Sequence, residues 1–154
     1  MTKLLSIIWS IIEACLKNGR YKTFLFLLIL PAVDVLGCPD KTELPVIQKA
    51  AERNNCCGDD FIILLAVRMA ENGPEGTEFG VLHPRAIDTD LDTQAGWAAA
   101  TVVKNRIRYN QQKRKEDFIE FLADRYCPPS VDPEGNRNWK KNVKFYVRKF
   151  RNAL

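Results

Sequence analysis

The sequence is poor in metal-binding side chains. It has a single histidine, His83, and its five cysteines include no Cys-x-x-Cys pair. Zinc sites are built from clustered cysteine and histidine, so this pattern argues against a zinc centre. We expect no metal site and no cofactor, and we interpret His83 as a structural loop residue. The chain also contains no internal repeat and no low-complexity segment.

Length and composition indicate one folded domain. The 154 residues are 46% hydrophobic and 27% charged, which is a globular rather than a disordered balance. The net charge of +4 is unevenly spread: residues 38–103 carry 5 basic and 11 acidic residues, and residues 104–154 carry 14 and 6. The basic half suggests an anionic partner such as nucleic acid, anionic lipid or cell-wall polymer, although solvated helix faces would explain it equally well.

The N-terminal segment differs from the rest of the chain. Residues 4–16 are mostly apolar, three basic residues follow, and a second apolar run ends at Gly37 and Cys38. This order is typical of a secretory signal, and the end of the run resembles a bacterial lipobox, whose cysteine is lipidated. We therefore assign residues 1–38 to a signal peptide, lipoprotein signal or membrane anchor, and expect the protein in the cell envelope. Translation from near Leu16 or a buried cytosolic hairpin are the alternatives.

Whether the cysteines form a disulfide depends on whether the protein is exported. In an exported protein, Cys127 would pair with Cys56 or Cys57, because disulfides persist in oxidising compartments. In a cytosolic protein the same residues would be small core side chains. The sequence leaves both possibilities open.

After residue 42 the pattern is mainly helical. Residues 61–70 are apolar on nearly every side, which predicts a central helix opened by Gly58-Asp59-Asp60. Residues 72–90 are rich in Gly, Pro and acidic residues, which predicts a loop or a short irregular strand. The other expected helices run from 42 to 54, from 90 to 107, over 117–126 and over 139–150, with a loop at 127–135.

Glu71 is the residue with the clearest chemical meaning. It follows the apolar run 61–70, and Asn72-Gly73-Pro74 interrupts the chain directly after it. On a helix, Leu64 and Val67 share its face. A carboxyl beside such a face is poorly solvated, which raises its pKa and suits a general acid at neutral pH. A surface glutamate at a helix end is the alternative.

Three segments, in this order, resemble those of a known family. They are Glu71-Asn72-Gly73, then Glu78-Phe79-Gly80-Val81-Leu82, then Arg125-Tyr126-Cys127-Pro128-Pro129 followed by Asn138-Trp139 and Asn142-Val143. The set resembles the lysozyme-like fold of lytic transglycosylases and phage muramidases. The resemblance implies a single compact, mainly α, lysozyme-like domain with minimal β structure over residues 43–154. Asn72 stands where the family usually has serine, and the glutamine common near its cleft motif does not follow Val81.

The resemblance also implies an activity. Such proteins cleave the MurNAc-GlcNAc β-1,4 bond of peptidoglycan, and Glu71 would act first as general acid and then as base. A hydrolytic lysozyme would add a second carboxylate. The candidates are Glu78, Asp88, Asp90 and Asp92. Glu78 ranks first among them because it lies inside the motif, although we favour a solvated loop glutamate over a catalytic one. Asp90 and Asp92 would serve equally well as helix caps.

Substrate contacts are implied for four residues. Glu78, Phe79 and Gly80 would line the bound glycan, since glycine allows a ligand to approach the backbone closely. Tyr146 would lie on the cleft floor, or else be a core aromatic with its hydroxyl at the surface.

Two other functions fit the residues. A non-catalytic peptidoglycan-binding or structural module could use the same fold. A nucleic-acid-binding protein would use the basic, aromatic segment 139–151. The export segment argues against nucleic acid as the partner. We expect a monomer that binds peptidoglycan strands, with possible membrane attachment through the N-terminus.

Overall fold

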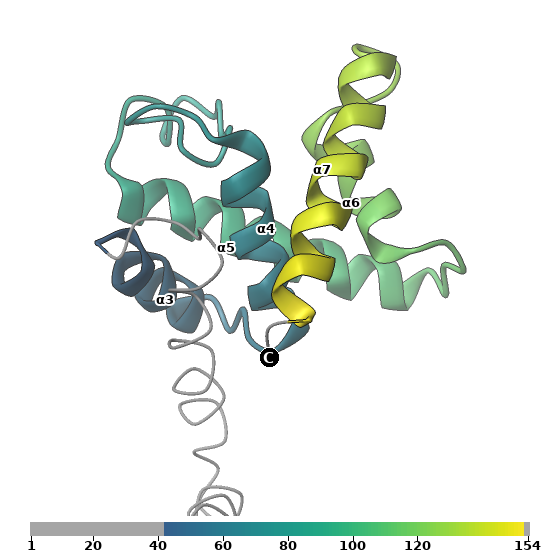
Figure 1. Cartoon of the computed structure of the whole chain (residues 1–154), viewed down its shortest axis with the longest axis horizontal. Coiled ribbons are helices and arrows are strands. Elements are labelled where there is room, and N and C mark those ends of the chain that lie inside the picture. The colour runs from purple at the N-terminus through teal and green to yellow at the C-terminus, as the bar shows by residue number, and fades with distance from the viewer. Residues whose placement is uncertain (1–41, 153–154) are drawn as a thin grey trace, which may run out of the picture.

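The computed structural model describes residues 42–152, and these form a helical unit (Figure 1). The helices are α3 (Glu43–Arg53), α4 (Asp59–Glu71), α5 (Leu91–Gln111), α6 (Phe118–Tyr126) and α7 (Pro133–Arg151). Residues 42–152 contain no strand, so the predicted helical class is confirmed and the minimal β component is absent from this range. The signal or anchor predicted at residues 1–38 lies outside the described residues. None of the helices in 42–152 is long and apolar enough to cross a membrane.

Helix α4 forms the centre of the fold, as its apolar sequence predicts. Its residues 61–67 are all buried. A helix that is apolar on all sides must be covered on all sides. It packs against α7 and α5, and Figure 1 shows α7 beside it while α5 runs behind. The side chains that surround it come from every other helix in the described range, so one core stabilises the whole unit.

Helices α4 and α7 run antiparallel, and polar bonds join them at both ends. At one end the Arg151 guanidinium bonds the Asp59 carboxylate at 2.6 Å. At the other end the Trp139 indole donates to Glu71 at 2.7 Å. Asp59 and Glu71 are twelve residues apart on α4, and Trp139 and Arg151 are twelve residues apart on α7. At 1.5 Å per residue, each separation is about 18 Å along the helix. The two helices therefore keep one register along their contact.

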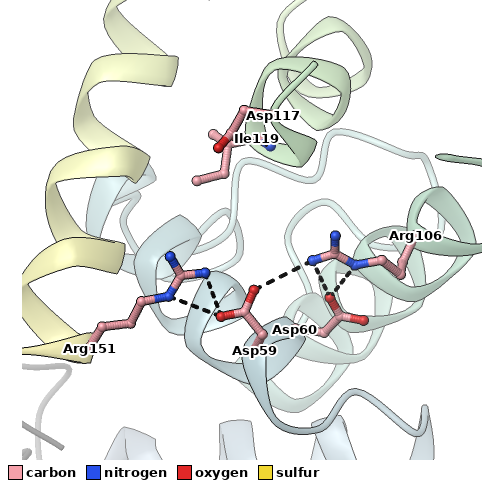
Figure 2. A network of polar contacts seen from close by, with 6 residues as sticks. All are labelled: Asp59, Asp60, Arg106, Asp117, Ile119 and Arg151. Carbon is pink, nitrogen blue, oxygen red and sulfur yellow. Dashed lines mark hydrogen bonds and ion pairs between the residues drawn. The ribbon is translucent and has the colours of Figure 1, made fainter. Parts of the chain in front are cut away.

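Helix α4 begins at Gly58-Asp59-Asp60, as predicted, with both aspartates in its first turn. Gly58 occupies the cap position, and no side chain caps the helix. Asp59 and Asp60 instead bind cations from other helices, as Figure 2 shows. Arg106 of α5 lies 2.8 Å from Asp60 and 3.8 Å from Asp59, while Arg151 takes the other side of Asp59. These ion pairs tie α4 to α5 and α7.

The helix boundaries mostly agree with the sequence. Asp90 caps α5 by accepting a hydrogen bond from the Thr93 amide at 2.8 Å, and Asn54 ends α3. The predicted loop at 127–135 was too long, and the helix expected from 139 begins at Pro133. Asp132 caps it, and proline fits the first helical position because its missing N–H needs no partner there.

The cysteines of the described range are free thiols. Cys56 is buried, Cys57 and Cys127 are partly exposed, and none of the three forms a disulfide. Burial raises the pKa of Cys56, so its thiol stays protonated and packs as a small apolar side chain. The predicted bridge from Cys127 to Cys56 or Cys57 is not formed.

The central position of α4 can be tested by replacing leucine with alanine at one buried and one exposed position. Leu64 is 0% exposed and Leu82 is 68% exposed. We expect Leu64→Ala to lower the free energy of unfolding by about 2–5 kcal/mol, because it opens a cavity in the core. Leu82→Ala should change it by less than about 0.5 kcal/mol. Urea unfolding followed by circular dichroism measures both; similar losses would contradict the central placement of α4.

Candidate functional site

The site is centred on Glu71, the last residue of α4. The next residue, Asn72, is in the left-handed conformation with φ 44°, and its amide bonds the Arg68 carbonyl at 3.0 Å. Asparagine tolerates this conformation better than most residues, and it ends helices in the same way as glycine. The chain therefore turns sharply after Glu71, which explains locally why asparagine fits where the resembling family has serine.

The Glu71 carboxylate lies between two partners that are distant in sequence. On one side the Trp139 indole Nε1 donates a hydrogen bond to Oε1 at 2.7 Å. On the other side is Gly80, where an added Cβ would lie only 2.4 Å from Oε2. Gly80 also has φ +64°, which side chains rarely permit. Glycine is thus required at this position by its backbone angle and by the carboxylate beside it.

Loop 72–90 brings Gly80 to this position (Figure 1, the teal loop after α4). A turn closes when the Gly80 amide bonds the Thr77 carbonyl at 2.9 Å. Arg68 supports the turn from α4, because its guanidinium bonds the Glu78 carbonyl at 3.4 Å and also pairs with Glu43 at 2.8 Å. The motif glycine is therefore held by helix α4 itself, one turn before Glu71.

Burial raises the pKa of Glu71 above its ordinary value of 4.5, and the Trp139 hydrogen bond opposes part of that rise. Burial dominates because few solvent or protein dipoles remain to stabilise the charge. The side chain is only partly covered, so it still reaches the surface. The expected poorly solvated carboxyl is confirmed, and its environment is that of a proton donor.

Tyr126 completes the surroundings of Glu71. Its ring stacks on Trp139, with centroids 5.1 Å apart and planes 23° from parallel. Its hydroxyl is buried and has no hydrogen-bond partner among residues 42–152. Burial and the nearby Glu71 charge both raise the pKa of Tyr126, so the hydroxyl remains a neutral donor.

The other predicted substrate residues lie at different depths. Glu78 is 6% exposed and Phe79 is fully buried, so the solvated interpretation of Glu78 is wrong. One Glu78 oxygen, Oε2, has no partner among the described residues. Phe79 belongs to the core and can reach a ligand only through its backbone. Tyr146 lies two helical turns beyond Trp139 and packs on Phe145 and Phe150.

The aspartates predicted as possible second carboxylates have other partners or lie in solvent. Asp90 caps α5, and hydrogen bonding to Thr93 lowers the pKa of its exposed carboxyl. Asp92 pairs with Arg53 at 2.7 Å. Asp88 is exposed, with φ 58° in the loop. The cap interpretation of Asp90 is confirmed.

Gln94 is an organising residue that the sequence did not reveal. It is 0% exposed and reaches from α5 under loop 72–90. Its side-chain nitrogen donates to the carbonyls of Gly76, Val81 and Ala86 at 2.9, 3.0 and 2.7 Å. Its oxygen accepts from the Val81 amide at 3.4 Å. One side chain thus bonds four backbone groups of a loop that has no regular structure, and it adds to the hydrogen bonds that the loop backbone forms with itself.

No protein-family model, curated protein sequence or solved structure matches the chain. The chemistry of the site therefore rests on the geometry around Glu71.

The role of Gln94 can be tested by comparing two glutamine substitutions on helix α5. We expect Gln94→Leu to lower the free energy of unfolding by about 1–3 kcal/mol, because the Val81 carbonyl loses its donor and the Gly76 and Ala86 carbonyls keep only the Asp88 amide and the Thr89 hydroxyl. Amide hydrogen exchange in residues 72–90 should rise at the same time. Gln111→Leu, at the exposed end of α5, is the matched control and should change neither measurement. Unchanged exchange in the Gln94 variant would show that the loop holds its shape without this residue.

The raised pKa of Glu71 gives a pH-dependent prediction. Between 4.5 and the higher native pKa, the folded protein keeps a proton that the unfolded chain loses, so stability falls as pH rises. Glu71→Gln removes this penalty and still accepts the Trp139 hydrogen bond. We expect the variant to melt at a higher temperature than the wild type at neutral pH and at the same temperature below pH 4.5. A difference independent of pH would contradict the buried-charge explanation.

Proposed function

We propose that this protein is a peptidoglycan-cleaving enzyme of the lytic transglycosylase type, acting on the MurNAc-GlcNAc β-1,4 bond. The observation that carries the proposal is the state of Glu71: one sheltered carboxyl with a raised pKa at the end of a buried helix. The glycine of the following motif lies directly against it. The order of Glu71, Gly80, Tyr126 and Trp139 along the chain also supports the resemblance to that group.

The proposed reaction uses Glu71 twice. Protonated Glu71 donates its proton to the glycosidic oxygen, and the bond to the sugar carbon breaks through an oxocarbenium-like state. The carboxylate then takes a proton from the sugar's own hydroxyl as that hydroxyl attacks the same carbon. The products are a free GlcNAc end and an anhydro-MurNAc end, and Glu71 regains its proton. The raised pKa serves the first step and the Trp139 hydrogen bond steadies the carboxylate for the second.

The Glu71 pKa is shifted by burial and by the Trp139 hydrogen bond, and no neighbouring charge within residues 42–152 contributes to that shift. A mechanism that takes its nucleophile from the substrate needs no second carboxylate and fits this arrangement.

The cations of the basic C-terminal helix are only partly used in packing. Lys140 and Lys144 of α7 both pair with Glu120 of α6, and Arg151 pairs with Asp59. The other four cations of the helix form no ion pair with the described residues; they are Arg137, Lys141, Arg148 and Lys149. They leave positive charge for an anionic partner, which in the proposed function is the cell-wall polymer.

The activity test compares two glutamates. We expect Glu71→Gln in the full chain to lower release of soluble fragments from purified peptidoglycan by about two to four orders of magnitude, the usual contribution of a general acid. Glu75→Gln, an exposed glutamate of the adjacent loop, should retain full activity. Equal release by wild type and Glu71→Gln would remove Glu71 from the mechanism.

Mass spectrometry of the fragments separates the two reaction types. Anhydro ends are expected, and reducing ends would identify a hydrolytic lysozyme instead. Binding of peptidoglycan without any cleavage by the wild-type protein would assign the chain to the alternative, a non-catalytic binding or structural module.

A further inference from the structure

A second feature of the surface lies away from Glu71, between the end of α3 and the first half of α5. It is an open hollow of about 390 Å³, which we call the α3–α5 hollow. Its lining residues are Arg53, Asn54, Asp92, Thr93, Gly96, Trp97, Ala100 and Lys104. Of the residues predicted for catalysis or substrate binding, it contains only Asp92, one of the candidate second carboxylates.

Trp97 is the unusual member of this set. It is only partly covered and does not belong to the hydrophobic core of the described residues. Its ring stacks on His83, with centroids 4.3 Å apart and planes 25° from parallel. His83 is itself exposed, and its Nδ1 accepts a hydrogen bond from the Arg85 amide at 3.2 Å. A tryptophan fixed in this way at the surface offers a flat apolar face to a ligand.

The floor of the hollow is flat, and its rim is polar. Gly96 and Ala100 lie one turn apart on α5, and an added Cβ on Gly96 would meet only Asn54, at 3.9 Å. Around this floor stand the Arg53–Asp92 ion pair at 2.7 Å and the Thr93 side chain. Lys104 is exposed and forms no ion pair with residues 42–152. The rim thus offers both donors and acceptors, together with one free cation.

The hollow lies within reach of the Glu71 site. Gly80 touches the Glu71 carboxylate, and His83 stacks on Trp97. Gly80 and His83 are only three residues apart, so at most about 11 Å of chain separates these two contacts. A polymer lying on Glu71 could therefore continue along loop 80–83 to Trp97.

We propose that the α3–α5 hollow is a second glycan-binding site, which holds an amino-sugar strand at a distance from the cleavage point. The Trp97 ring would stack on the C–H face of a sugar, as aromatic faces pack on flat apolar surfaces. The Arg53–Asp92 pair and Thr93 would bond its hydroxyl and acetamido groups, and Lys104 would pair with a carboxylate of the stem peptide that a muramic acid residue carries. The inference takes its ligand class from the proposed function, but its test measures binding and not cleavage.

The experiment uses the full chain carrying Glu71→Gln, so that the glycan is not consumed. Two affinities are measured. Retention on purified insoluble peptidoglycan gives the affinity for the polymer, and calorimetric titration gives the affinity for chitotetraose, a neutral N-acetylglucosamine oligomer. Trp97→Ala removes the stacking face. Gly96→Leu fills the hollow and keeps the Trp97 side chain. It decides the test if Trp97→Ala does not fold. Phe145→Ala, which truncates an aromatic 52% exposed on α7, is the control.

We expect both hollow variants to weaken both affinities by about tenfold, the loss of one well-formed stacking contact, and the control to change them by less than twofold. Lys104→Gln should weaken binding of peptidoglycan only, since chitotetraose has no carboxylate. Affinity within twofold of the control in either folded hollow variant overturns the site. Failure of the wild type to cleave peptidoglycan while the hollow variants lose binding would instead overturn the proposed function and leave this site standing.

Discussion

The hydrogen bond from Trp139 to Glu71 is the interaction on which the site depends. It joins residues 68 positions apart and fixes one end of the α4–α7 contact. It also sets the chemistry of the carboxyl, because it opposes the desolvation that raises the Glu71 pKa. Without it the carboxyl would lose both its orientation and its only described donor. Packing and reactivity are thus determined by the same bond.

The site makes use of the strongest element of the fold. Helix α4 is buried along residues 61–67, so its last turn has little freedom to move. A carboxyl at the end of this helix is both held in place and poorly solvated. Burial destabilises the charged form of this acid, so the proposed function of Glu71 would carry a cost in stability. The Asp59–Arg151 and Asp60–Arg106 pairs at the other end of the helix join the same elements where no such conflict arises (Figure 2).

Local patterns in the sequence predicted the helices well and the contacts poorly. The apolar run before Glu71 and the Asp90 cap each specify structure within a few residues, and both predictions were confirmed. The start of α7 was misplaced because Pro133 was taken to continue the loop, whereas proline is favoured at a first helical position.

The long-range partners could not be predicted in the same way. Trp139 and Tyr126 were visible in the motif that resembles the family, but nothing in the residues showed that the indole would reach Glu71. Gln94 looks like any polar residue in the first turn of a helix. Only the position of loop 72–90 over α5 reveals that its amide is buried and has four backbone partners.

Gly80 has a consequence for how such proteins diverge. A side chain there would collide with the Glu71 carboxyl and would also strain the backbone, so two constraints act on one residue. A homologue that keeps Glu71 in this position must therefore keep the glycine. The residue at position 80 then reports whether the carboxyl keeps its place, whereas position 72 accepts any side chain that tolerates a left-handed turn.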